Sequence, residues 1–92
     1  MSPGIDDLLE ELETDDVGQK RYLMYHVFDL LIEELYELKE QQLKDVAERV
    51  RSLRDFDGYM YKLAQEFLTS SSTLEKERKL EKMLDHVERL RD

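Results

Sequence analysis

The chain has 92 residues, 40% of them charged, no cysteine and a formal net charge of −9. These values exclude disulfides and thiolate metal sites, predict one small domain, and argue against direct nucleic-acid binding, because phosphates repel an acidic surface. No apolar run reaches the roughly 20 residues of a membrane span, and the acidic N-terminus is unlike the basic start of a signal peptide. We expect a soluble cytoplasmic protein with no cofactor, and with neither nucleic acid nor a membrane as partner.

Residues 1–16 are predicted to form an acidic amphipathic N-terminal helix, or arm. Ser2 and Pro3 are typical of an N-cap and a first helical residue. Four apolar residues then recur with the helical spacing i, i+3, i+4, i+7, namely Ile5, Leu8, Leu9 and Leu12. The first 19 residues contain no basic residue and seven carboxylates, which are Asp6, Asp7, Glu10, Glu11, Glu13, Asp15 and Asp16. Either of the last two is a suitable cap for the next helix.

Residues 17–92 are predicted to form a helical bundle domain that starts with one long central helix. No proline, glycine or turn cluster interrupts residues 19–54, so we expect one continuous helix through this range. The alternative is a bend at residues 39–42, which are all polar and lie within a five-residue step from Leu38 to Leu43.

Two shorter helices are expected after the loop signal Asp55–Gly58. The first covers about residues 59–68, and the second follows the capping box Ser72–Glu75. The predicted fold class is therefore all-α: a small helical bundle with one long central helix and two antiparallel return helices. Because the return helices cover only part of the apolar stripe on the long helix, we expect a homodimer to complete the bundle.

Three glutamates in the long helix are the basis of an enzymatic alternative. Glu33, Glu34 and Glu37 form an E-E-x-x-E pattern that resembles the metal-binding motif of all-helical nucleotide pyrophosphohydrolases of the MazG type. The resemblance implies a nucleotide substrate and Mg²⁺, which prefers oxygen ligands. That family's second motif, E-x-x-D on the following helix, has no counterpart, because the E-x-x-D of this chain, Glu13 to Asp16, lies upstream. A solvated helix face is the expected role of the three glutamates.

We predict a non-enzymatic protein–protein interaction module, such as an adaptor, assembly factor or chaperone-like protein, because no nucleophile, base and orienting group can be named together. The expected partner is a protein with a helical or basic surface, since an acidic amphipathic helix suits a basic groove with an apolar floor. The alternatives are an acidic inhibitor or antitoxin that imitates nucleic acid, and the Mg²⁺-dependent enzyme. The predicted partner-binding residues are Ile5, Asp6, Asp7, Leu8, Leu9, Glu10, Glu11, Leu12, Tyr22 and Tyr25.

Overall fold

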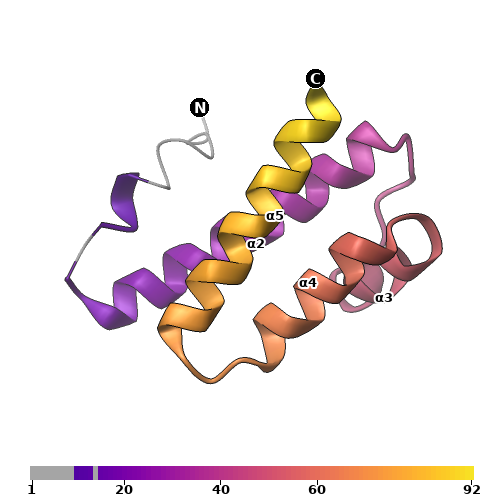
Figure 1. The fold of residues 1–92 in the computed structure, drawn as a ribbon. Coiled ribbons are helices and arrows are strands. Elements are labelled where there is room, and N and C mark those ends of the chain that lie inside the picture. Colours follow the sequence, from indigo (N-terminus) through magenta and orange to yellow (C-terminus); the bar gives the residue numbers. More distant parts are fainter. Residues whose placement is uncertain (1–9, 14) are drawn as a thin grey trace.

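The computed structural model of the protein describes residues 10–13 and 15–92. Helices α2 (Val17–Leu38), α3 (Val46–Phe56), α4 (Gly58–Thr69) and α5 (Thr73–Arg91) follow one another along the chain (Figure 1). Glu10 and Glu11 are also helical, and no strand occurs in these two ranges. The predicted small all-α bundle is therefore confirmed. No helix in the described ranges is long and apolar enough to cross a membrane.

Helix α2 forms because its apolar residues recur at three- and four-residue steps and therefore share one face. It begins after Asp16, whose side chain accepts a hydrogen bond from the Gln19 amide at 3.0 Å, as predicted for this capping position. The face that this pattern creates is buried from the second turn of the helix onward and consists of Leu23, Met24, Val27, Phe28, Leu31, Ile32, Leu35 and Tyr36.

The predicted continuous helix through residue 54 is wrong, because α2 ends at Leu38 and α3 begins at Val46. The chain leaves the helix through Glu40, which has a positive φ of 54°. The Gln41 amide donates to the Tyr36 carbonyl at 2.8 Å and the Glu40 amide to the Glu37 carbonyl at 3.1 Å. These two bonds form the Schellman arrangement, which satisfies carbonyls at the end of the helix. The alternative of a bend in the polar stretch after Leu38 is the one that the structure supports.

The turn between α3 and α4 is shorter than the predicted loop at residues 55–58. Asp57 alone separates the two helices, and its side chain caps α4 by accepting a hydrogen bond from the Met60 amide at 3.0 Å. Helix α5 begins after Ser72, whose hydroxyl accepts from the Glu75 amide at 3.4 Å, as the predicted capping box requires.

The polar contacts between α4 and α5 show that these helices are antiparallel. Lys79 of α5 pairs with Glu66 near the end of α4 at 2.7 Å, and His86, later in α5, contacts Asp57 at the start of α4 at 2.7 Å. The two return helices therefore run in opposite directions, as predicted.

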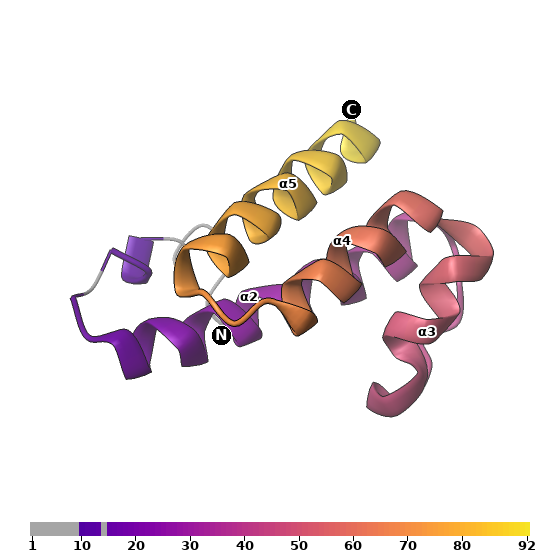
Figure 2. The same ribbon diagram turned by 60° about the horizontal axis from the view of Figure 1, so that its bottom comes forward.

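Helices α2 and α5, in contrast, are parallel. Near their first turns Lys20 pairs with Glu77 at 3.3 Å, and towards their ends Arg91 pairs with Glu34. Both ion pairs join residues 57 positions apart in the sequence, which is the signature of two helices in the same direction. Figures 1 and 2 show that α4 starts near the end of α2 and runs back towards the start of α5.

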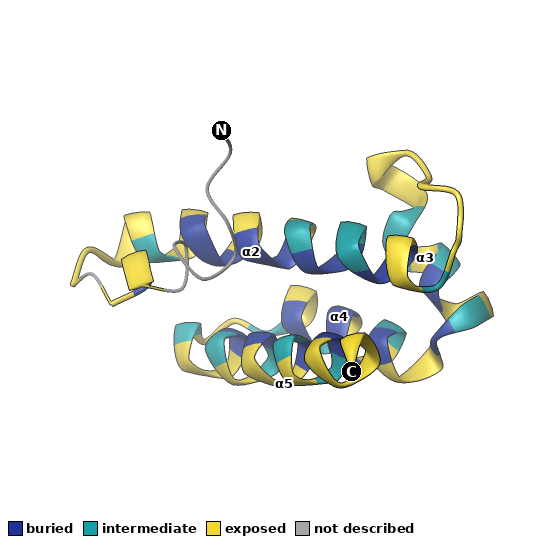
Figure 3. Cartoon of the chain, turned by 90° about the horizontal axis from the view of Figure 1, so that it is seen from above, coloured by how far each residue is buried: buried dark blue, intermediate teal, exposed yellow. Residues whose placement is uncertain are grey.

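The core lies where α2 faces α4 and α5 (Figure 3). Its centre is Phe67 of α4, whose ring stacks on Phe28 at 4.7 Å between centroids and meets the edge of Tyr25 at 5.4 Å. Both partners belong to α2, so these aromatic contacts fix how α4 lies on that helix. Offset-stacked and edge-on pairs of this kind stabilise beyond the area that they bury.

Candidate functional site

An apolar groove opens between α2, α3 and the end of α4, and we call it the α2–α3 groove. It encloses about 180 Å³. Its wall includes Val46, which is 74% exposed, and Leu68, which is also exposed. The complete lining is Tyr25, Phe28, Asp29 and Ile32 of α2, Val46, Arg49 and Val50 of α3, and Leu68 of α4. Apolar and aromatic side chains therefore predominate in the groove.

The end of α2 and the contacts of α3 with that helix create the groove. Because the chain turns at Glu40, α3 packs against the second half of α2 instead of continuing it. The Tyr36 hydroxyl donates to the Arg49 carbonyl at 2.6 Å, and the ring of Phe56 meets the Tyr36 ring edge-on at 4.9 Å. Arg49 also pairs with Glu33 of α2 at 3.2 Å. These contacts hold α3 at a fixed position beside α2.

Asp29 gives the groove an acidic wall. Desolvation raises the pKa of this carboxyl above its ordinary 3.8, and the negative charge of Glu33 acts in the same direction, whereas Arg49 and His26 oppose the shift. The structure shows no ion pair for Asp29 among residues 10–13 and 15–92. A carboxylate in this position is stabilised by a cation that approaches it from outside.

The positive charge of Arg49 is already engaged within the protein. Its Nε donates to the Lys44 carbonyl at 2.8 Å, and its Nη1 donates to Glu33 at 3.2 Å. Asp45 and Glu48, which flank Val46 in the sequence, are both exposed. The polar part of the groove is therefore more suited to a basic ligand than to an acidic one.

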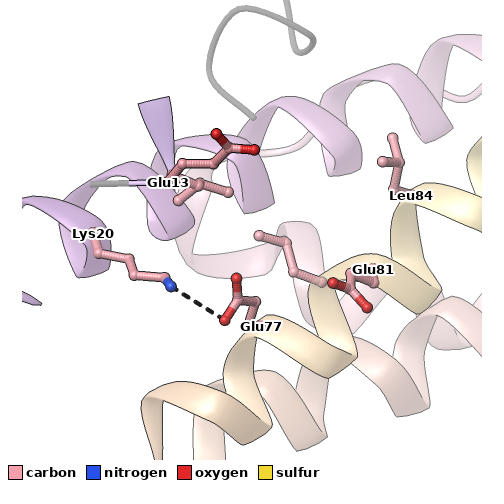
Figure 4. Close-up of a pocket in the computed structure, with 7 residues that line it drawn as sticks. Glu13, Lys20, Glu77, Glu81 and Leu84 are labelled. Atoms are coloured by element: carbon pink, nitrogen blue, oxygen red, sulfur yellow. Dashed lines mark ion pairs between the residues drawn. The ribbon is translucent and has the colours of Figure 1, made fainter. Parts of the chain in front are cut away.

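A second cavity, which we call the N-terminal cavity, lies on the other side of the bundle and encloses about 330 Å³. Figure 4 shows it between the segment before α2, the start of α2 and one side of α5. The Lys20–Glu77 ion pair closes one edge of it. Its lining consists of Leu12, Glu13, Lys20, Glu77, Leu80, Glu81 and Leu84.

The predicted partner-binding residues do not form one surface. Tyr25 lines the α2–α3 groove, and Tyr22 lies three residues earlier on α2 with 71% of its surface exposed. Leu12 instead lines the N-terminal cavity and is only 6% exposed. Glu10 and Glu11 are exposed. The others lie outside the described residues, and they are Ile5, Asp6, Asp7, Leu8 and Leu9.

The three glutamates of the enzymatic alternative are directed to different partners. Glu33 pairs with Arg49 of α3, and Glu34 pairs with Arg91 of α5. Glu37 is exposed. Within the part of the chain that the structure describes, no group of three or more His, Cys, Asp or Glu side chains is placed to hold a metal ion together.

Sequence reasoning missed the contributions of α3 and α4 to the groove. The predicted continuous helix would carry Val46 and Val50 away from Tyr25, so it does not bring these three residues together. The signal that could have found them is the five-residue step from Leu38 to Leu43, which shifts the apolar stripe and favours a new helix.

Comparison with known proteins adds no relative from which a function could be transferred. No family model matches the chain, and no curated protein or solved structure matches it.

Proposed function

We propose that this protein is a non-enzymatic interaction module that binds a basic amphipathic helix of a partner protein in the α2–α3 groove. The observation that supports the proposal is the groove itself, in which Tyr25, Val46 and Leu68 present exposed apolar surface beside the carboxylate of Asp29. An apolar floor with a polar anchor is the arrangement by which grooves hold amphipathic helices.

The volume of the groove favours a side chain of a protein as its occupant. About 180 Å³ is below the roughly 300–1,000 Å³ of typical small-molecule sites. A partner would insert one or two apolar side chains here, and its helix would rest on the exposed surfaces of Tyr22 and Val46. Interfaces draw most of their binding energy from a few such anchored side chains.

The charges of the groove supply the specificity in this proposal. A lysine or arginine one turn from the inserted residue would reach Asp29, which is exposed at the wall of the groove. Because Arg49 already pairs with Glu33, it offers an acidic partner little additional attraction. Added salt should weaken binding, since it screens charge pairs at the surface.

The test uses two labelled helical peptides that carry leucines at i, i+3, i+4 and i+7 and differ only in flanking lysines or glutamates. Fluorescence anisotropy should show that the lysine peptide binds the full chain and that the glutamate peptide binds at least about tenfold more weakly, or about 1.4 kcal/mol. Asp29→Asn should weaken binding of the lysine peptide and make that binding less dependent on salt. Equal affinity for the two peptides would contradict the proposal.

The matched variants are Val46→Lys and Val17→Lys. Each valine is the first residue of its helix, follows an aspartate cap and is more than half exposed, so the two substitutions add the same charge in the same local setting. Only Val46 lines the groove. Val46→Lys should reduce binding of the lysine peptide at least about tenfold, and Val17→Lys should leave it near the unmodified value.

A further inference from the structure

The N-terminal cavity has an apolar floor that the described residues leave open. Leu80 is buried, Leu84 is half-buried, and Leu12 approaches them from the segment before α2. Figure 4 shows Leu84, Glu77 and Glu81 of α5 on one side of the open space and Glu13 on the other. About 330 Å³ remains between them, which is enough for further apolar side chains to pack beside Leu12.

We propose that the N-terminal arm of the same chain fills this cavity by packing Leu8 and Leu9 beside Leu12. The described segment Glu10–Glu13 lines the cavity with Leu12 and Glu13, and nine residues precede this segment in the sequence. Glu10 and Glu11 are helical, and Leu8 and Leu9 precede Leu12 by four and three residues. On a helix, residues at these spacings lie on one face.

The charges around the cavity specify which face of the arm enters. Glu13, Glu77 and Glu81 lie at its edge, and Lys20 is engaged with Glu77. The negative charges of these glutamates would repel a carboxylate that entered the cavity. If the arm is helical, with 3.6 residues per turn, its apolar residues would lie opposite its acidic ones, which are Asp6, Asp7, Glu10 and Glu11. The apolar face can therefore enter while the carboxylates stay in solvent.

Covalent attachment favours the arm over a second copy or a foreign helix. A segment that is joined to the edge of its own site has an effective concentration in the millimolar range. A separate molecule at ordinary concentration would have to displace it. Once docked, the arm presents Glu10 and Glu11, with Asp6 and Asp7, as a fixed acidic ridge beside α5.

The test exploits the absence of cysteine from the natural chain. Glu81→Cys places a thiol at the exposed edge of the cavity and is combined with Leu9→Cys on the apolar side of the arm. The matched control combines the same Glu81→Cys with Asp7→Cys on the acidic side. After treatment of the full chain with a short bis-maleimide, the Leu9 pair should crosslink within one molecule at least about fivefold faster than the Asp7 pair.

Three crosslinking results would overturn the inference. Equal crosslinking rates for the two pairs would show that the apolar face is not selected, and absence of a crosslink in both would show that the arm lies elsewhere. Crosslinked dimers in place of monomers would assign the cavity to the arm of a second copy.

Thermal denaturation gives a second test that needs no cysteines. Leu9→Asp should lower the thermal midpoint by about 4 °C or more, whereas Asp7→Asn should not. An unchanged midpoint for Leu9→Asp would count equally against the docking.

Discussion

At the scale of single residues, Glu40 determines how α2 ends. Its φ of 54° lies in the left-handed region, where a side chain other than that of glycine costs roughly 1–2 kcal/mol. The two bonds at this turn, to the carbonyls of Tyr36 and Glu37, are those for which glycine is the usual residue. The protein therefore keeps a residue with an unfavourable backbone conformation at the turn that forms the α2–α3 groove.

We predict that Glu40→Gly stabilises the protein by about 0.5–1 kcal/mol, because glycine adopts the left-handed conformation without the steric cost. Glu40→Ala is the control, since it removes the same charge and keeps the Cβ. Urea denaturation followed by circular dichroism measures both variants. A gain of the same size in the alanine variant would show that charge, rather than backbone conformation, is responsible.

At the scale of elements, Lys76 joins the end of α4 to the start of α5. Its side chain is only 2% exposed, and its Nζ donates to the Phe67 carbonyl at 2.6 Å. That carbonyl lies in the last turn of α4, where the helix itself supplies no donor. The ammonium also lies 4.9 Å from the ring centre of Phe67 and 5.3 Å from that of Tyr25, within the range of cation–π attraction.

We predict that Lys76→Ala destabilises the protein by about 2 kcal/mol, because it removes a buried hydrogen bond to a charged donor and the packing of the side-chain stem. Lys79→Ala is the comparison, since Lys79 is one turn later and its ion pair with Glu66, at 2.7 Å, is only half-buried and contributes less than a fully buried bond. Chemical denaturation at pH 7 should show a clearly larger loss of unfolding free energy for Lys76→Ala than for Lys79→Ala. Equal losses would contradict the capping role of Lys76.

The effect of Lys79→Ala should also depend on pH. The hydrogen bond from Lys79 lowers the pKa of Glu66 below its ordinary 4.5. A carboxyl whose pKa is lower in the folded state stabilises that state above the unfolded value, and this stabilisation disappears as the pH falls through the folded value. The difference between the variant and the natural chain should therefore shrink as the pH is lowered below about 4.5.

The helices and their ends also show which features of the fold can be predicted from the sequence. Helical periodicity predicted the all-α bundle, and the capping roles of Asp16 and Ser72 followed from short-range rules that act within one turn. The end of α2 was missed because it depends on Glu40 adopting a conformation that its residue type disfavours. The burial of Lys76 is not visible in the sequence, since it depends on aromatic rings from α2 and α4. The lining of the groove depends on the end of α2 and on the packing of α3 and α4 against that helix, and the only sequence signal for it is the five-residue step from Leu38 to Leu43.

At the scale of the whole molecule, the bundle depends on one aromatic centre. Phe67 has no exposed surface and contacts Phe28 and Tyr25 of α2 and Lys76 of α5. The side chain thus connects the three helices that form most of the core. A domain of this size has a free energy of unfolding of about 5–14 kcal/mol. Removal of this aromatic centre therefore costs a large fraction of that free energy.

We predict that Phe67→Ala lowers the free energy of unfolding by about 3–5 kcal/mol through lost burial and the cavity left behind. Leu74→Ala is the control, because Leu74 is exposed and its truncation should change stability by about 0.5 kcal/mol or less. Guanidinium denaturation measures both. A loss below about 1 kcal/mol for Phe67→Ala would mean that the helices hold together without this contact.

The parallel course of α2 and α5 has a mechanical consequence. The start of α2 and the end of α5 lie at opposite ends of the bundle (Figure 1), and α2 alone measures about 33 Å at 1.5 Å per residue. A force applied between these points would slide the two helices along one another, so that the Lys20–Glu77 and Glu34–Arg91 pairs and the apolar contacts between them are loaded at once. Two antiparallel helices pulled from adjacent ends would instead separate one contact at a time. A molecule stretched along this axis should therefore resist extension and give way in a single step.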